Sequence, residues 1–189
     1  MRGHKFTPGV PCPDIQVSLL AGGMHTISRV AAPGNWKLIV FYRGLHCPFC
    51  VSYVKELDGM SKAFLQSNVE VLAISGDPKE KASILAAEHD LSMDIGFDLT
   101  TVQMDQMGLY ISDAANAHET DRPFCEPGLF VLNAEGLVHI ISIANAPFAR
   151  PDLSKIKQSL DYIRLPEDQR HDYYGARYPI RGTHLISNV

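Results

Sequence analysis

The segment that most constrains the fold of this chain is Cys47-Pro48-Phe49-Cys50, which stands between an apolar run and a helical pattern. The apolar run at residues 38–42 is typical of a buried strand, and apolar side chains recur at helical spacing after the second cysteine. Pro48 suits the first position of a helix, because its missing N–H would be unpaired there, so Cys47 is the expected N-cap. The sequence therefore predicts two thiols at a strand-to-helix junction.

Thiols at the start of a helix are activated by their position. The unpaired amides and the positive end of the helix dipole stabilise a thiolate there and lower the pKa of a cysteine from about 8.5 towards neutrality. Arg43 and His46 are candidate positive charges beside Cys47. Helix geometry favours exposure of the N-cap sulfur over the sulfur one turn later. A thiolate attacks either a disulfide sulfur or a peroxide oxygen, so the motif serves two reactions.

Composition and charge narrow the class of protein. The chain has 189 residues and a formal net charge of -4, without a run of lysine or arginine. This length suits one core with a tail, and this charge argues against nucleic acid or an anionic membrane as a partner. No stretch approaches the roughly 18 apolar residues of a membrane span, and residues 1–10 lack the apolar core of a signal peptide. We therefore expect a soluble, cytoplasmic protein.

The four cysteines are too few to staple a chain of this length, so we expect reactivity, metal binding or packing from them. A structural zinc site needs four ligands, and the sequence has no second CxxC and no paired-histidine spacing. Cys12 is expected to be a packing residue. Cys125 is either a third thiol near the site or, as lone cysteines more often are, a small buried hydrophobe. We expect no metal and no organic cofactor.

The remaining sequence predicts a mixed α/β domain. Asp77, Pro78 and Glu80 are expected to cap and open a helix. The expected strands form a hairpin at residues 16–20 and 24–28, single strands at 37–42 and 69–75, and a second hairpin at 128–132 and 137–143. The expected helices run from the cysteine pair to about residue 66, over 77–90, over 101–107 and between 151 and 166. This order predicts a thioredoxin-like fold, a central mixed β-sheet flanked by helices with an N-terminal β-hairpin.

The end of the chain differs from the rest. We expect residues 1–166 to form the domain and residues 167–189 to form an extension with too few apolar residues for a core of its own. Tyr173, Tyr174 and Tyr178 favour an ordered contact, because aromatic residues are enriched where proteins meet. The extension is therefore expected to pack on the body or on a partner subunit, and a homodimer is the candidate assembly.

The segment from Phe41-Tyr42 through the loop to Cys50 resembles the active-site segment of the peroxiredoxins, the alkyl hydroperoxide reductase and thiol-specific antioxidant family of the thioredoxin superfamily. The resemblance spans roughly residues 8–165. In this register Cys50 is the peroxidatic cysteine and Cys47, which stands where the family has a threonine or serine, resolves it. A thioredoxin register instead makes Cys47 the attacking thiolate and Cys50 the resolver. Arg43 replaces the proline that peroxiredoxins usually carry after the strand.

The second departure from the family lies in Pro127-Gly128-Leu129-Phe130. Pro127 stands where peroxiredoxins have an arginine and thioredoxins have a cis-proline, and a cis bond there would place backbone groups to dock an extended substrate. Arg122, in the preceding loop, is a candidate for the missing cation.

Together these features predict a thiol-dependent oxidoreductase that reduces hydroperoxides through Cys47 and Cys50 and is regenerated by a thioredoxin- or glutathione-class donor. One alternative keeps the fold and acts on protein disulfides. Another is a non-catalytic redox sensor or binding module, whose disulfide changes its affinity for a partner.

Overall fold

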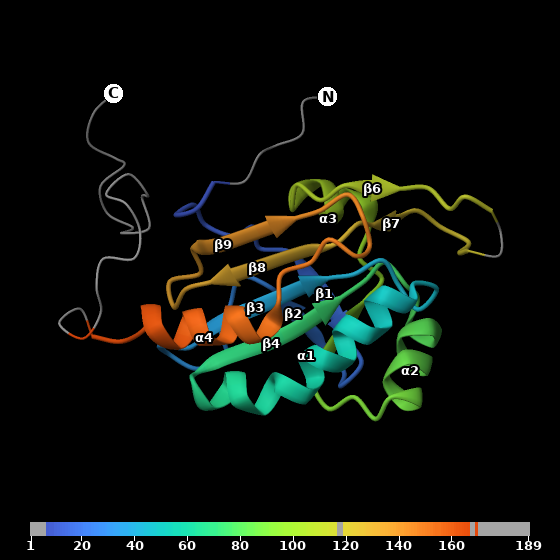
Figure 1. The fold of residues 1–189 in the computed structure, drawn as a ribbon. Helices are drawn as coiled ribbons and strands as arrows, with labels where there is room; N and C mark the ends of the chain where they lie inside the picture. The colour runs from blue at the N-terminus through green and yellow to red at the C-terminus, as the bar shows by residue number, and fades with distance from the viewer. Residues whose placement is uncertain (1–6, 117–118, 167–168, 170–189) are drawn as a thin grey trace, which may run out of the picture.

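A seven-stranded mixed sheet with strand order β2-β1-β5-β4-β3-β8-β9 forms the centre of the molecule (Figure 1). The structure is a computed structural model, and it describes residues 7–116, 119–166 and 169. The helices are α1 (Pro48–Gln66), α2 (Lys79–Glu88), α3 (Thr101–Gln106) and α4 (Leu153–Ile163). The strands are β1 (Gln16–Leu19), β2 (Met24–Thr26), β3 (Trp36–Phe41), β4 (Val69–Ile74), β5 (Asp94–Phe97), β6 (Ile111–Ser112), β7 (Phe124–Cys125), β8 (Gly128–Leu132) and β9 (Val138–Ile143).

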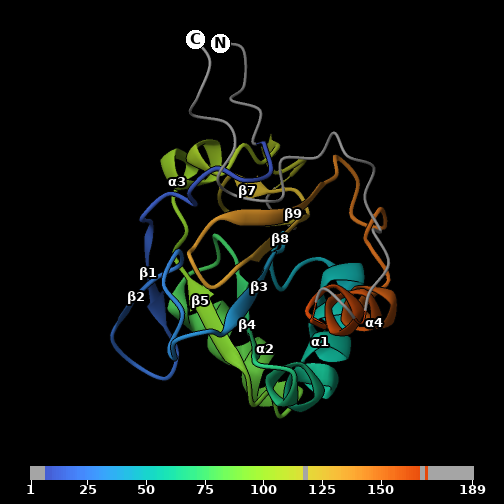
Figure 2. The ribbon, with the colours of Figure 1, turned by 90° about the vertical axis from the view of Figure 1, so that its left-hand side faces the viewer.

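Both faces of the sheet are covered, which explains why the central strand β3 is a continuous apolar run. Leu38 and Val40 face the core formed with α1, α2 and α4, whereas Ile39 and Phe41 face the core formed with α3 and the N-terminal segment. Figure 2 shows α1 and α4 together on one side of the sheet and α3 on the other. The predicted thioredoxin-like fold is therefore confirmed.

Strand directions decide which loops meet at the edge of the sheet where β3 ends. Strand β3 runs parallel to β4 and antiparallel to β8, and β9 runs antiparallel to β8. The carboxyl ends of β3 and β9 therefore lie at the same edge. The loop that carries Cys47 and the loop that joins β9 to α4 are neighbours as a result.

The predicted hairpins, strands and helices are confirmed to within a few residues at each end. Strand β5 and the two-stranded ladder of β6 and β7 were not predicted. The predicted cap of α2 was wrong, because the N-cap of α2 is Pro78 and no side chain bonds the first amides. Asp77 is buried, and its Oδ2 accepts the N–H of Leu45 at 2.7 Å, so this carboxylate holds the loop before Cys47.

No helix in the described part of the chain is long and apolar enough to cross a membrane. The expectations for residues 167–189, with their three tyrosines, concern positions that lie outside the described residues, Gln169 excepted.

Candidate active site

Cys47 is the N-cap of α1, as predicted. Its backbone is extended, with φ -106° and ψ 104°, and Pro48 occupies the first helical position. The Sγ atom of Cys47 accepts the N–H of Cys50 at 3.3 Å, and its carbonyl accepts the N–H of Val51 at 3.0 Å. The sulfur of Cys47 therefore takes the place of the side-chain oxygen that usually satisfies the first amides of a helix.

The two cysteines form one electrostatic unit. A hydrogen bond from the Cys50 thiol, together with the Cys50 amide and the guanidinium of Arg43, lowers the pKa of Cys47 to about 6 in spite of its burial. The same hydrogen bond, with burial, raises the pKa of Cys50 above its usual range. Within the pair, these interactions favour the thiolate of Cys47 over that of Cys50.

Arg150, which the sequence did not single out, contacts the second cysteine. Its Nη2 donates to Sγ of Cys50 at 2.9 Å, and its Nε donates to the carbonyl of Pro147 at 2.8 Å. The guanidinium also lies over the ring of Tyr53, 5.0 Å from its centroid. Arg150 belongs to the loop after β9. Because β8 runs antiparallel to both β3 and β9, this loop leaves the sheet at the same edge as the loop that carries Cys47, and the strand order was the signal that could have located Arg150.

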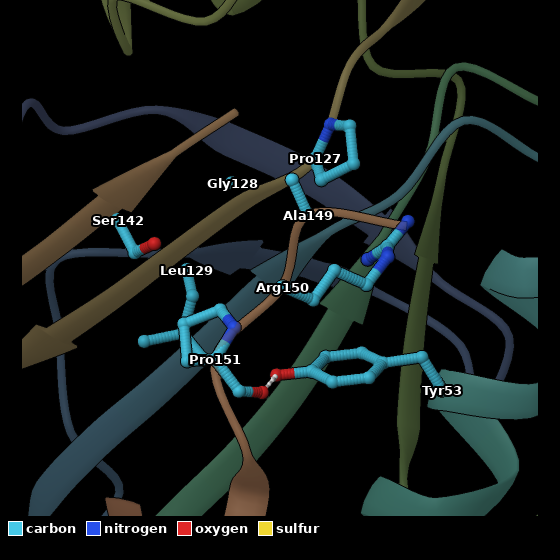
Figure 3. Close-up of a pocket in the computed structure, with 8 residues that line it drawn as sticks. All are labelled: Tyr53, Pro127, Gly128, Leu129, Ser142, Ala149, Arg150 and Pro151. Atoms are coloured by element: carbon cyan, nitrogen blue, oxygen red, sulfur yellow. Dashed lines mark hydrogen bonds between the residues drawn. The ribbon is translucent and has the colours of Figure 1, made fainter. Parts of the chain in front are cut away.

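A small recess adjoins this contact between Arg150 and Cys50. Figure 3 shows the guanidinium of Arg150 and the ring of Tyr53 at one side of it, with the Tyr53 hydroxyl donating to the carbonyl of Pro151 at 2.7 Å. The lining residues are Tyr53, Pro127, Gly128, Leu129, Ser142, Ala149, Arg150 and Pro151. The recess therefore places mostly apolar surface next to the cation that contacts the pair.

Arg43 is the cation beside Cys47, and its charge is shared among several partners. A side-chain hydrogen bond links it to Cys47. Its Nη2 donates to Oε1 of Glu119 at 2.8 Å, and its Nε lies 3.5 Å from Oε1 of Glu126. The guanidinium also lies 4.5 Å from the ring centroid of Phe124. One cation therefore faces one thiolate and two carboxylates.

The loop between β3 and Cys47 is fixed by a close approach of side chain to backbone. Gly44 has φ +144°, and a Cβ at this position would lie 2.6 Å from Oδ1 of Asp77. Burial raises the pKa of Asp77, and its bond from the Leu45 amide opposes that rise. Only glycine fits at this position. The Asp77 carboxylate packs against Gly44 and bonds Leu45, and it therefore fixes the loop between Arg43 and Cys47.

The structure does not bring every predicted residue to the pair. His46 packs on Phe124 with ring centroids 4.8 Å apart, and burial and the charge of Arg43 lower the pKa of His46, which disfavours the positive charge expected of it beside Cys47. Arg122 pairs with Asp121 at 3.3 Å and Asp98 at 3.7 Å in the outer loop, and the guanidinium that contacts Cys50 is that of Arg150.

Pro127 lies beside Arg150 in the recess, as Figure 3 shows. No peptide bond is cis in the part of the chain that the structure describes, so the bond before Pro127 is trans. Its carbonyl already accepts the N–H of Ala144 at 2.9 Å. The docking geometry that a cis bond would have provided is absent at this residue.

The expected exposure of the first sulfur was wrong. Cys47 is 2% exposed and Cys50 is fully buried, because both belong to the core and are packed by the loop before α1, through Leu45, and by the loop before α4, through Arg150. A partner protein therefore reaches either sulfur only after local movement of these loops.

The other two cysteines are also buried. Sγ of Cys125 donates to the carbonyl of Tyr42 at 3.3 Å, and burial raises the pKa of this thiol to about 12. Burial likewise raises the pKa of Cys12 to about 12. Both are inert thiols at neutral pH, in keeping with packing roles. Within the described residues, no group of three or more histidines, cysteines or carboxylates is arranged to hold a metal ion.

A mixed sheet whose central strand leads to a CxxC pair at a helix N-terminus defines the class of thioredoxin-fold thiol proteins, and solved peroxiredoxins share the fold. A mutant of peroxiredoxin 6 of Arenicola marina is 15% identical with a TM-score of 0.71, over 93% of this chain and 88% of that chain. Peroxidoxin BcpB of Mycobacterium tuberculosis is 18% identical with a TM-score of 0.70, over 85% and 100%.

The bacterioferritin comigratory protein of Xanthomonas campestris, which has alkyl peroxide reduction activity, is 18% identical with a TM-score of 0.62, over 81% of this chain and 96% of that chain. At these identities the likeness establishes the fold. No curated protein matches the sequence. The sequence model of the AhpC/TSA family matches residues 8–141, more than half of the chain, and the chain therefore belongs to the AhpC/TSA family. It is a peroxiredoxin-like thiol oxidoreductase, as the resemblance implied.

Proposed function

We propose that this protein reduces hydroperoxides with Cys47 as the attacking thiolate and Cys50 as the resolving thiol. The observation that carries the proposal is the position of Cys47 as the N-cap of α1, where its sulfur accepts the N–H of Cys50 at 3.3 Å and the guanidinium of Arg43 lowers its pKa. Membership of the AhpC/TSA family supports a peroxide as the substrate, and so does the alkyl peroxide reduction of the Xanthomonas campestris relative.

The first step forms a sulfur–oxygen bond and breaks the peroxide oxygen–oxygen bond. The Cys47 thiolate attacks one peroxide oxygen, Cys47 becomes a sulfenic acid, and the departing alkoxide or hydroxide takes a proton to leave as an alcohol or water. Arg43 donates to the reacting sulfur and offers a fixed positive charge for the oxygen on which negative charge develops.

The second step closes the disulfide. Cys50 loses its proton, its sulfur attacks the Cys47 sulfenic acid, and water leaves as the sulfur–sulfur bond forms. The N–H of Arg150 at 2.9 Å stabilises the Cys50 thiolate in this step and again when Cys50 is the leaving group during reduction. Burial of both sulfurs suits a small substrate in the first step, since a peroxide needs less room than a protein disulfide.

Regeneration requires two electrons from an external dithiol, and we infer a thioredoxin- or glutathione-class donor in the cytoplasm. The loops that cover Cys47 and Cys50 must open for that donor. We also infer that residues 1–166 form the catalytic domain and that the protein acts as a homodimer to which residues 167–189 contribute.

The test is rapid mixing of the fully reduced protein with hydrogen peroxide and with an organic hydroperoxide, followed by mass spectrometry of the cysteines. The proposal predicts a Cys47–Cys50 disulfide at a rate far above that of free cysteine, no such rate in Cys47→Ser, and a sulfenic acid on Cys47 in Cys50→Ser. Cys125→Ala is the matched control and should react like the native protein. A sulfenic acid formed rapidly on Cys50 in Cys47→Ser would establish the peroxiredoxin register and overturn the assignment.

A second candidate function is protein disulfide reduction, which the low pKa of an N-cap cysteine favours. The buried sulfurs and the trans bond before Pro127 count against it. Turnover with insulin and dithiothreitol discriminates the two, because a disulfide reductase accelerates it and the proposed peroxidase leaves it near the uncatalysed rate.

A further inference from the structure

Glu126 is a buried carboxylate that stands next to the active-site arginine, and no step of the proposed mechanism uses it. We propose that Glu126 is a positioning residue that limits how much of the Arg43 charge reaches Cys47 and so keeps the Cys47 thiolate nucleophilic. This inference rests on the proposed role of Cys47 as the attacking sulfur.

The position of Glu126 is fixed from two sides. Its backbone N–H donates to the carbonyl of Tyr110 at 2.8 Å, and its Oε1 accepts the hydroxyl of Ser112 at 2.7 Å. Its side chain is only 8% exposed, and the same Oε1 lies 3.5 Å from Nε of Arg43. The carboxylate therefore presents a fixed negative charge to the guanidinium from the strand ladder behind it.

The contact between Arg43 and Glu126 is a long ion pair, at 3.5 Å, and not a hydrogen bond. Nε of Arg43 and Oε2 of Glu126 are both buried and have no hydrogen-bond partner among the described residues. A pair that served stability alone would gain from closing this gap, because each unpaired buried charged atom is destabilising. Instead the hydroxyl of Ser112 holds the carboxylate back, and Arg43 stays directed to Cys47 and Glu119.

The charge balance around Cys47 gives the direction of the effect. Arg43 is the cation that bonds Cys47, while Glu119 and Glu126 offset its charge. Removing the charge of Glu126 leaves more of the Arg43 charge to the thiolate and lowers the Cys47 pKa further. The titratable and charged groups that face Cys47 and Arg43 from the packed elements are Cys50, His46, Lys81, Glu119, Glu126 and, through Cys50, Arg150.

A lower pKa would not help the reaction at neutral pH. With a pKa of about 6, Cys47 is already mostly thiolate at pH 7. The intrinsic nucleophilicity of a thiolate falls as its pKa falls, about threefold for each unit. Glu126 therefore makes the Cys47 thiolate less stable but more reactive, and it acts through Arg43 as the intermediary.

The experiment measures the rate of Cys47 alkylation by iodoacetamide against pH, with the modified residue identified by mass spectrometry. We expect Glu126→Gln, whose amide oxygen still accepts from Ser112, to move the pH midpoint down by roughly half a unit to one unit and to lower the high-pH plateau rate about two- to threefold. An unchanged midpoint, or one that rises, would overturn the proposal.

Glu119→Gln is the matched control, since it removes the same charge from the same arginine at a more exposed position, 24% against 8%. Its shift should be smaller than that of Glu126→Gln, because solvent screens it. Glu126→Gln in an Arg43→Met background tests the intermediary directly. A midpoint shift as large as in the native background would mean that Glu126 acts on Cys47 without Arg43, and the proposal would fail.

Ser112→Ala keeps the test decisive if Glu126→Gln does not fold. It frees the carboxylate to approach Nε of Arg43, so the midpoint should rise, opposite in sign to Glu126→Gln; no change or a fall would contradict the proposal. Iodoacetamide reacts without peroxide, so the shifts are measurable even if the protein proves not to reduce peroxides. Failure of the proposed function and failure of this inference are thereby distinguishable.

Discussion

The hydrogen bond from the Cys50 thiol to Cys47 is the largest influence on the pKa of Cys47, and its removal gives a strong prediction. A hydrogen bond to a charged group contributes about 1.5–3 kcal/mol, which corresponds to about one to two pKa units. Cys50→Ala should therefore raise the pKa of Cys47 from about 6 to between about 7 and 8. The fraction of thiolate at pH 7 would fall from about nine-tenths to half or less.

The assay is the absorbance of the thiolate near 240 nm, titrated against pH, together with the pH dependence of Cys47 alkylation. Cys50→Ser is the conservative variant, because its hydroxyl still donates, and its shift should be smaller than that of Cys50→Ala. Cys125→Ala removes an equally buried thiol that does not contact the pair, and it should leave the midpoint unchanged. A midpoint that stays near its native value in Cys50→Ala would refute the description of the two cysteines as one electrostatic unit.

Three further predictions follow from the loops and charges at the site. Gly44→Ala should destabilise the protein by about 2 kcal/mol or more, because the new side chain would strain the backbone and clash with Asp77. Gly59→Ala is the control, since Gly59 has open space inside α1, and it should stabilise the protein by about 0.5–1 kcal/mol. Chemical denaturation measures both free energies of unfolding, and equal effects would contradict the role of Gly44. Arg150→Lys should slow reduction of the Cys47–Cys50 disulfide by dithiothreitol about tenfold, since lysine lacks the planar fork that serves Cys50 and the loop carbonyl together, and an unchanged rate would remove Arg150 from the mechanism. Because the pKa of Cys47 is lowered in the folded protein, its ionisation stabilises the fold above the pKa of the unfolded state, and this contribution is lost as the pH falls to about 6. The free energy of unfolding of the native protein, relative to that of Cys47→Ser, should therefore fall from pH 9 to pH 6. A constant difference would contradict the pKa shift.

The junction that carries the thiols could be predicted from the sequence because its determinants are local. A buried strand, a proline at the first helical position and apolar side chains at helical spacing require no knowledge of the rest of the chain. The structure accordingly confirms Cys47 as N-cap and α1 as a helix that ends at Gln66.

The partners of the thiols could not be predicted in the same way because they come from distant segments. Arg150 is 100 residues from Cys50 and reaches it only through the strand order of β8 and β9. Asp77 fits a local capping pattern, yet the loop before Cys47 competes for its carboxylate and burial holds it there. The interpretation of Asp77 as a helix N-cap was therefore wrong, because its carboxylate accepts the amide of Leu45 and not the first amides of α2.

Strand β5 was missed for a different reason. It has four residues, its Gly96 adds no apolar side chain, and its place between β1 and β4 is set by pairing with both neighbours rather than by its own pattern. The burial of both sulfurs was likewise invisible in a local description, because the covering loop before α4 is distant in sequence.

The most direct test of the account is the site and pH dependence of the first oxidation step. Cys50→Ser, mixed rapidly with hydrogen peroxide and trapped with a sulfenic-acid reagent, isolates that step from disulfide closure. The account predicts rapid labelling of Cys47, with a rate that rises with pH along the ionisation of that thiol. Labelling no faster than that of free cysteine, in both Cys50→Ser and the native protein, would contradict Cys47 as the peroxide-reacting thiolate.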